Sequence, residues 1–243
     1  VPMNKQGDFI KVNVFGKEYS GKALFQILET YVRKAFFEKD PVEKEKSKDI
    51  MWYLWMSPNS PIYGRNKMAT FERYFVADEK LHGEKNNDYY RLIDKPEISE
   101  KILEEFGLSG KHIHIVNGHV PIRAKEGEKP VKSKGKVIMI DGGFSKTYQR
   151  KTGIAGYTLT YNSHGMTLSA HEPFVSVDEA VQKELDMVSK FRMIETAESR
   201  VTVGDTDYGK KMERRILDLK ELIKLYQSGE MAERDAVGKK LRK

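Results

Sequence analysis

Apolar residues recur every three to four positions in five segments of the chain, and this period predicts amphipathic helices. Serine, proline or glycine stands where several of these segments begin or end, as capping preferences require. The last segment places Met212, Ile216, Leu219, Ile223 and Tyr226 on one face, which we expect to be buried. The predicted helices run from Ser20 to the break at Lys39–Pro41, over about Val42–Leu54, from Pro96 to Gly107, from Ser176 through Val188, and over about Tyr208–Gln227.

Alternating or continuous apolar runs predict strands between these helices. The expected strands are Phe9–Phe15, His112–Val116, Lys136–Ile140, and the two arms of a hairpin that turns at Asn162–Gly165. Helices come first, strands next and helices again, an order typical of an α/β (α+β) or layered sandwich fold. We expect a helix-rich segment over residues 1–110 and a strand-rich half with C-terminal helices over residues 111–243, joined in one structural domain.

Composition narrows the classes of protein to consider. The 243 residues include 43 Lys and Arg against 36 Asp and Glu, so the formal net charge is +7. This charge suits either an ordinary hydrated surface or a protein that handles anions such as phosphates or nucleic acid. The absence of cysteine excludes disulfides, thiol catalysis and thiolate metal sites. Without a membrane-length apolar run or a secretory signal, we expect a cytoplasmic protein.

The first candidate site is the irregular segment Trp55–Met68, whose prolines, asparagines and glycine disfavour a regular element. Asn59, Arg65 and Lys67 offer an amide, a planar guanidinium and an ammonium group. Such a set of donors suits a phosphate. The alternative is a solvated surface loop.

Histidines mark a second candidate site. His119 follows an apolar strand and Asn117-Gly118, so its imidazole would project from a strand end, where it can meet a metal. His112 and His114 lie two residues apart in a predicted strand, hence on one face, and this spacing can also hold a metal. The alternative in each case is a solvated or packed histidine.

Two further segments contain carboxylates. Asp141 follows a buried strand and precedes two glycines, so it is either a cap or a hydrogen-bond partner beside a ligand. Val203–Asp207 superficially resembles a carboxylate metal motif, but it precedes a long helix, and Thr206 or Asp207 is better explained as the N-cap. Gly-rich phosphate loops and the His-Glu-x-x-His motif are absent.

Four long strings resemble class III fructose-1,6-bisphosphatases: Leu54–Phe75, His114–Arg123, Lys136–Tyr157 and Val203–Lys210. The resemblance extends over nearly the whole chain and implies the C-terminal half of a calcineurin-like two-sheet sandwich flanked by helices. Of the metal-ligand strings of that family, only the last is present, as Gly118-His119. Val1–Asn4 resembles the residues that follow the preceding histidine ligand, so we expect a fragment that begins just downstream of it.

The resemblance also implies an activity and a cofactor. The intact enzyme would use two Mn²⁺ ions to hydrolyse the 1-phosphate of fructose 1,6-bisphosphate, giving fructose 6-phosphate in gluconeogenesis. No general acid is assigned, because it would come from the missing part. We expect this chain alone to bind Mn²⁺ weakly and to be inactive. The resemblance implies that His119 is a metal ligand and that Asn117 and Asp141 support the metal ligands. It also implies a substrate-binding loop over residues 54–75, with Asn59, Arg65, Lys67 and Arg73 as the binding residues.

Partners and alternatives follow from the same reasoning. Half of a sandwich would expose apolar surface, so we expect the upstream part of the protein to cover it, or self-association. One alternative is a related metallophosphoesterase with another substrate, such as a phosphoprotein or nucleotide. The other is a non-enzymatic nucleic-acid-binding module. The interspersed charges, as in Glu43–Lys46, argue against nucleic acid, and we expect neither nucleic acid nor membrane as a partner.

Overall fold

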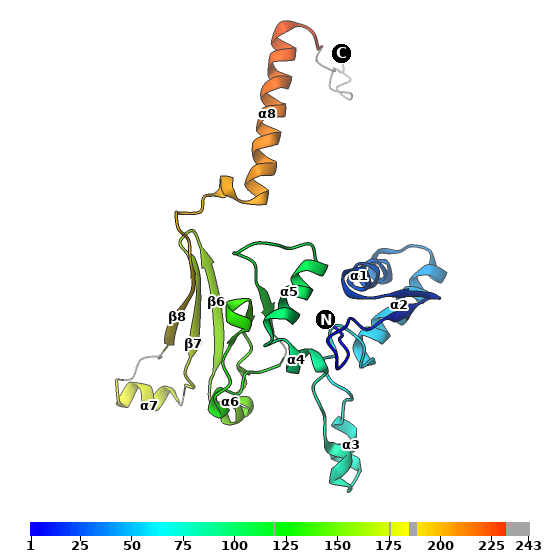
Figure 1. Cartoon of the computed structure of the whole chain (residues 1–243), viewed down its shortest axis with the longest axis vertical. Coiled ribbons are helices and arrows are strands. Elements are labelled where there is room, and N and C mark those ends of the chain that lie inside the picture. Colours follow the sequence, from blue (N-terminus) through cyan, green and yellow to red (C-terminus); the bar gives the residue numbers. More distant parts are fainter. Residues whose placement is uncertain (119, 175, 185–188, 232–243) are drawn as a thin grey trace, which may run out of the picture. The chain divides into compact units, whose positions relative to one another are not determined.

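The computed structural model describes residues 1–118, 120–174, 176–184 and 189–231 (Figure 1). Its contacts divide the chain into two compact units. The first comprises Val1–Thr158 and Ala170–Lys190, and the second comprises Leu159–Ser169 with the described residues from Phe191 onward. The described residues form a mixed α/β structure with three small sheets. None of their helices is long and apolar enough to cross a membrane.

The predicted helices are present, and local chemistry explains where several of them begin. The Asp40 carboxylate accepts a hydrogen bond from the Glu43 amide, and Pro41 occupies the first turn of α2. Pro96 likewise begins α5. The helices of the first unit are α1 (Gly21–Phe37), α2 (Pro41–Met56), α3 (Thr70–Phe75), α4 (Asp88–Leu92), α5 (Pro96–Glu105), α6 (Lys146–Thr152) and α7 (Val177–Gln182), with the 3₁₀ helices η1 (Glu79–His82), η2 (Ala124–Glu126) and η3 (Ser133–Gly135).

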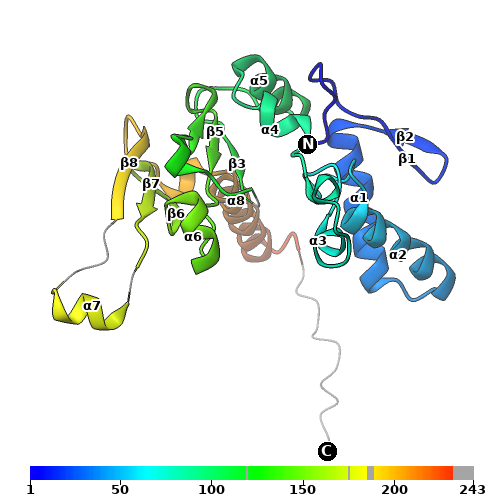
Figure 2. The ribbon, with the colours of Figure 1, turned by 90° about the horizontal axis from the view of Figure 1, so that it is seen from below.

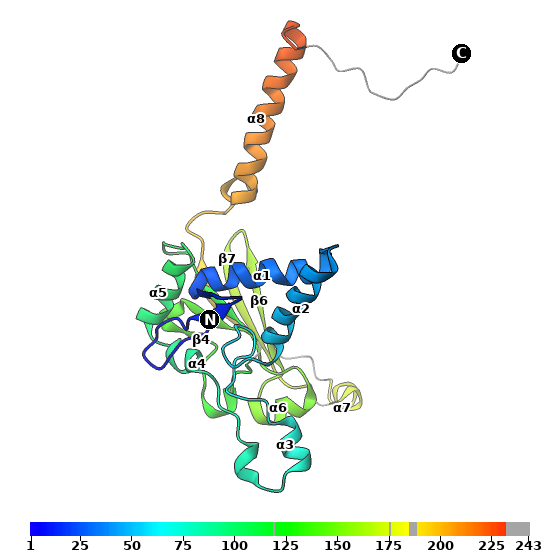
Figure 3. The ribbon, with the colours of Figure 1, turned by 90° about the vertical axis from the view of Figure 1, so that its right-hand side faces the viewer.

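A hairpin of β1 (Val12–Val14) and β2 (Lys17–Tyr19) packs against α1 and α2 (Figure 3). It turns at Phe15 and Gly16, which both have positive φ, as a tight two-residue turn requires. The shared core consists of Val12, Val14, Leu24, Leu28 and Ile50. The predicted strand is therefore confirmed in shorter form, and its partner β2 was missed.

The second sheet has the order β3-β5-β4, formed by β3 (Ile115–Asn117), β4 (Val131–Lys132) and β5 (Val137–Met139) (Figure 2). β3 and β5 run parallel, whereas β4 and β5 are antiparallel. All three residues of β5 are buried, as its continuous apolar run predicted.

The prediction that His112 and His114 share a strand face is wrong, because β3 begins only at Ile115. Ile115 pairs with Val137, so an extension of β3 would place His114 opposite Lys136, the C-cap of η3, and Ile113 opposite Gly135, which lies in η3 with a φ of +97°. The ladder therefore ends there. His114 Nδ1 instead lies 2.9 Å from the Gly135 carbonyl oxygen.

The third sheet contains the predicted hairpin, β6 (Gly156–Asn162) and β7 (Gly165–His171), followed by β8 (Ser189–Thr196) in the order β6-β7-β8. The side chain of Ser176 caps α7 as expected. The helix ends earlier than predicted, at Gln182, because Lys183 is its C-cap and Glu184 has a positive φ of 51°. Leu185 and Val188 lie outside the described residues. The sequence interpretation missed β8, whose Phe191 and Met193 are exposed.

The second unit contains η4 (Val203–Asp205) and the long helix α8 (Asp207–Ser228). Thr206 Oγ1 accepts a hydrogen bond from the Gly209 amide at 3.0 Å, so the N-cap prediction is confirmed. The predicted burial of the apolar stripe is wrong: its five side chains are 39% to 57% exposed. A helical period shows that one face is apolar, but it does not supply a surface that covers this face. The stripe consists of Met212, Ile216, Leu219, Ile223 and Tyr226.

A candidate anion-binding site

Five cationic side chains line one polar cavity of about 370 Å³ in the first unit. Arg65 and Arg73 come from the long excursion between α2 and α4, over residues 57–87. Arg123, Lys132 and Lys151 come from the segments around β4 and from α6. Two carboxylates, Glu84 and Glu128, share the lining, so positive charge prevails. The other lining residues are Asn86, Tyr90, Val120, Pro121, Met139, Tyr148 and Thr152.

Backbone pairing at the base of the excursion positions the first pair of arginines. The Asn66 amide donates to the Lys85 carbonyl at 2.9 Å, and the Asn87 amide donates to the Gly64 carbonyl at 3.0 Å. The side chain of Asn66 accepts a hydrogen bond from the Lys85 amide at 2.7 Å. Arg65 and Asn86 therefore form an antiparallel β-bridge between the two chain segments. The two ends of the excursion lie side by side at this bridge, beside the cavity.

Glu84 organises this wall of the cavity. Its side chain is only 9% exposed, accepts a hydrogen bond from the Ala69 amide at 2.8 Å, and pairs with Arg65 and with Arg73, the latter at 3.4 Å. Burial alone would raise the pKa of the Glu84 carboxyl, but these hydrogen bonds and positive charges outweigh it and hold the pKa below its usual value. Glu84 is therefore an anion at neutral pH that fixes two guanidinium groups.

Glu128 has the corresponding role on the other wall. It accepts a hydrogen bond from the Arg123 amide at 3.0 Å and pairs with Lys132. Burial acts to raise the pKa of Glu128, and here too the hydrogen bonds and the charges of Lys132 and Arg123 hold it below its usual value. Among the residues that the structure describes, Lys151 has no hydrogen-bond or ion-pair partner, so its charge is available to a ligand.

The structure separates the four predicted substrate residues. Arg65 and Arg73 share the cationic cavity. Lys67 donates a hydrogen bond to the Leu81 carbonyl and lines a neighbouring, more apolar cavity of about 430 Å³ that also contacts Arg65. Asn59 lines neither of these two cavities, and its carbonyl accepts a hydrogen bond from the Tyr53 hydroxyl at 2.9 Å.

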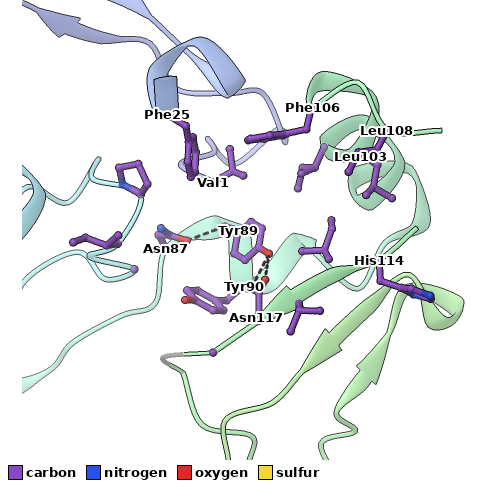
Figure 4. A pocket seen from close by; sticks show the side chains of 17 residues that line it. Val1, Phe25, Asn87, Tyr89, Tyr90, Leu103, Phe106, Leu108, His114 and Asn117 are labelled. Atoms are coloured by element: carbon purple, nitrogen blue, oxygen red, sulfur yellow. Dashed lines mark hydrogen bonds between the residues drawn. The ribbon is translucent and has the colours of Figure 1, made fainter. Parts of the chain in front are cut away.

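Asn117 lies in a third, largely apolar cavity of about 590 Å³, which Figure 4 shows from close by. Its side-chain oxygen accepts a hydrogen bond from the Tyr89 hydroxyl at 2.9 Å. Burial raises the pKa of Tyr89, so this hydroxyl keeps its proton. Asn117 is therefore bound to Tyr89 in this structure.

Asp141 does not line the cationic cavity, but both Asp141 and His119 lie within two residues of a lining residue in the sequence. Asp141 accepts a hydrogen bond from the Gly143 amide at 2.8 Å. Its charge adds to burial in raising the pKa of Tyr90, which lines the cavity, while Arg65 acts in the opposite direction. His119, the predicted metal ligand, lies outside the described residues. Its neighbour Val120 lines the cationic cavity.

The described residues do not by themselves fit a metal ion. No three histidine, aspartate or glutamate side chains among them gather closely enough to hold one. The carboxylates of the cationic cavity each pair with cations. Oxygen donors that already neutralise guanidinium and ammonium groups are poor ligands for a divalent cation.

Sequence reasoning missed Arg123, Lys132 and Lys151, together with the two carboxylates that orient the cations. Arg123 and Lys151 do fall within the strings that carry the family resemblance. In a chain with 43 Lys and Arg, however, no local pattern separates these three from the rest. Their common feature is spatial, because the fold brings them to one cavity with Arg65 and Arg73, which lie far from them in the sequence.

A mixed α/β fold with a cation-lined cavity defines a protein suited to small, phosphate-bearing ligands. The profile of the Firmicute fructose-1,6-bisphosphatase family matches residues 1–228. The chain therefore belongs to the Firmicute-type, or class 3, fructose-1,6-bisphosphatase family. The resemblance found in the sequence is thereby confirmed.

Several curated relatives carry the name fructose-1,6-bisphosphatase class 3. The protein from Bacteroides fragilis is 48% identical over 235 residues, which is 96% of this chain and 35% of the relative. Those from Alkaliphilus metalliredigens and Clostridium botulinum are each 48% identical, over 232 and 230 residues, covering 94% of this chain and 35% of the relative. The chain thus spans about a third of the length of these relatives. No solved structure matches it significantly.

Proposed function

We propose that this chain is the substrate-binding part of a fructose-1,6-bisphosphatase, which hydrolyses the 1-phosphate of fructose 1,6-bisphosphate in gluconeogenesis. The cationic cavity is the observation that carries this proposal. Its five cations line a concave site of about 370 Å³, within the size range of small-molecule sites. A nucleic-acid-binding surface would instead present cations and exposed aromatic rings along a groove or face.

Arg65 and Arg73 are the proposed ligands of the phosphate that reacts. Guanidinium groups can donate two parallel hydrogen bonds to phosphate oxygens, and their charge stabilises the negative charge that the transition state spreads over these oxygens. Glu84 holds both groups at the cavity wall, so little ordering would be needed when substrate binds. Lys67 and Asn59, which lie outside this cavity, would act on the substrate only from its margin.

The remainder of the active site is proposed to come from the two thirds of the relatives' length that this chain does not cover. We place most ligands of the Mn²⁺ ions there, with His119 contributed by this chain, in a calcineurin-like sandwich completed by both parts. Because the described donors do not fit a metal ion, no step of the reaction is assigned through one. Asn117 and Asp141 flank His119 in sequence and are proposed to support it.

Exposed apolar side chains support such a completing segment. Phe36, Phe37, Trp52 and Trp55 are each at least 64% exposed on α1 and α2. Large exposed apolar patches usually mark surfaces that another polypeptide covers. Light scattering on the purified chain should show self-association that disappears when the completing polypeptide is added.

Phosphate release from fructose 1,6-bisphosphate with Mn²⁺ tests the proposal. The chain alone should bind Mn²⁺ weakly and release no phosphate, whereas addition of the remaining polypeptide of a relative, such as that of Bacteroides fragilis, should restore release. An Arg73→Gln variant in the assembled enzyme should lose activity at least about tenfold, the loss of one charge-assisted hydrogen bond. A panel of phosphoproteins, nucleotides and sugar phosphates provides the decisive comparison, since preference for a non-sugar substrate would refute the proposal.

A further inference from the structure

We propose that Tyr90 recognises the sugar at the cationic cavity: its hydroxyl donates a hydrogen bond to the hydroxyl on C2 of fructose 1,6-bisphosphate, the carbon next to the one that carries the reacting phosphate. The inference rests on the proposed function, because it takes this sugar as the ligand and Arg65 and Arg73 as the groups that bind its 1-phosphate. Cations that bind phosphates do not distinguish one sugar bisphosphate from another, so a neutral group has to make this choice.

Tyr90 lies where two cavities meet. It lines the cationic cavity together with Arg65 and Asn86, and it also lines the apolar cavity of about 590 Å³. Its side chain is partly buried, and its hydroxyl has no hydrogen-bond partner among the residues that the structure describes. In Figure 4 this hydroxyl points away from the hydrogen-bonded pair of Tyr89 and Asn117. A partly buried hydroxyl that the fold does not use is available to a ligand.

The fold holds the Tyr90 ring in a fixed position. The helix α4 begins after Asn87, whose side chain accepts a hydrogen bond from the Tyr89 amide at 3.1 Å and whose own amide donates to the Gly64 carbonyl at 3.0 Å. The Tyr90 ring packs edge to face against Tyr89, with the ring centroids 5.2 Å apart. Tyr89 is itself buried and hydrogen-bonded to Asn117. A donor that is ordered in advance loses little entropy when a ligand binds.

The same contacts place Tyr90 beside the group proposed to bind the reacting phosphate. Gly64, to which α4 is tied, directly precedes Arg65. Burial raises the pKa of the Tyr90 hydroxyl, Arg65 acts to lower it and Asp141 to raise it, so the hydroxyl keeps its proton and can donate. When the 1-phosphate lies on Arg65, the first sugar hydroxyl beyond the ester is the one on C2. It is therefore the hydroxyl that a donor next to Arg65 would reach.

A matched pair of ligands tests this contact in the 243-residue chain. The analogue 2,5-anhydromannitol 1,6-bisphosphate keeps the five-membered ring and both phosphates of the sugar but lacks the hydroxyl on C2. In isothermal titration at low ionic strength, the wild-type chain should bind fructose 1,6-bisphosphate about tenfold more tightly than the analogue, the difference that one net hydrogen bond makes. Tyr90→Phe should lose about tenfold in affinity for fructose 1,6-bisphosphate, keep its affinity for the analogue, and so bind both equally.

Two controls separate direct contact from an effect on the fold. Tyr161→Phe is the matched variant, since Tyr161 is 62% exposed on β6 and lines none of the three cavities described above, and it should leave both affinities unchanged. The urea midpoint of Tyr90→Phe should equal that of the wild type. A lower midpoint would mean that the fold already uses the hydroxyl and would overturn the inference.

A parallel loss is the main result that would contradict the role of Tyr90. If Tyr90→Phe weakens both ligands by the same factor, the hydroxyl does not contact the group on C2. Equal affinity of the wild-type chain for the two ligands, or no binding of fructose 1,6-bisphosphate, would also overturn the inference, even if the assembled enzyme releases phosphate. Selective binding by the chain without phosphate release from the assembled enzyme would instead refute the proposed function and support the role of Tyr90.

Discussion

Substitution of Glu84 by glutamine isolates the contribution of one buried carboxylate to the excursion over residues 57–87. The glutamine side chain keeps an oxygen that accepts the hydrogen bond from the Ala69 amide, but it loses the charge that pairs with Arg65 and Arg73. Hydrogen bonds to a charged group contribute about 1.5–3 kcal/mol each, and neutral ones about 0.5–1.5 kcal/mol. Because both arginines are more than a third exposed, water weakens their pairs. We expect a loss of about 1–3 kcal/mol in unfolding free energy.

The corresponding alanine variant should lose more. Glu84→Ala also leaves the Ala69 amide without its acceptor, and Ala69 is fully buried. An unsatisfied buried donor adds about 1–3 kcal/mol to the loss. The order of stability should therefore be wild type, then Glu84→Gln, then Glu84→Ala, and hydrogen exchange at the amides of Asn66, Ala69 and Asn87 should accelerate in the same order.

The pH dependence gives an independent check of the same interaction. The folded protein holds the pKa of Glu84 below its usual value, so the carboxylate stabilises the fold fully above the pKa of an unfolded glutamate, about 4.3. This contribution is lost as the pH falls through the lower folded pKa. The stability difference between wild type and Glu84→Gln should thus be constant from pH 7 to about pH 5 and should shrink below about pH 4.

Urea unfolding followed by tryptophan fluorescence and circular dichroism measures these differences, with Glu79→Gln as the matched control. Glu79 lies in η1 of the same excursion, is exposed, and has no ion-pair partner among the described residues. Its substitution should change stability by less than about 0.5 kcal/mol. If Glu84→Gln and Glu79→Gln change the unfolding free energy equally at pH 7, the ion pairs of Glu84 with Arg65 and Arg73 contribute no more than solvated surface pairs. The conclusion that Glu84 fixes both arginines at the cavity wall would then be wrong.

Two further substitutions test the packing around the cavities. Tyr89→Phe removes the hydroxyl that satisfies the Asn117 side chain, so it should destabilise the fold by about 1–3 kcal/mol in urea unfolding, and an unchanged midpoint would contradict the hydrogen bond. Gly142→Ala would place a methyl group 2.6 Å from the Gly156 α-carbon, so it should lower the unfolding free energy by more than about 2 kcal/mol. Gly83→Ala is the control, because Gly83 has a negative φ and no atom lies within 4 Å of the added methyl group, so the unfolding free energy should change by less than about 1 kcal/mol. Equal effects of the two alanine substitutions would refute the close approach of the Gly142 and Gly156 backbones.

Sequence patterns predicted those features that depend on neighbouring residues. Ser176 and Thr206 cap helices through amides three residues further along, so local spacing was sufficient to find them. The continuous apolar run of β5 showed that it is buried on both faces. The start of β3 was mispredicted because it depends on η3, about twenty residues downstream.

The candidate site was only partly predictable for the same physical reason. Arg65 was found through its loop composition, but its orientation depends on Glu84, 19 residues away, in a segment with no distinctive pattern. Lys151 and Lys132 reach the cavity through α6 and β4, and hydropathy contains no information on which surface cations converge. Which cationic side chains lie together depends on the tertiary structure, so it cannot be predicted from a sequence that contains many lysines and arginines.

The contrast between α1 and α8 shows what a helical period does and does not imply. Both helices have an apolar stripe, and in α1 Leu24 and Leu28 are buried because β1 and α2 cover them. In α8 the stripe is exposed along its length, although the family match extends to residue 228, the last residue of this helix. Because these side chains remain exposed to water, the stripe contributes little to the stability of the described chain. Ile216→Ser should accordingly leave the stability of the chain within about 0.5 kcal/mol of wild type, whereas Leu24→Ala should cost about 2–5 kcal/mol. A large loss for Ile216→Ser in the chain alone would mean that α8 is already packed.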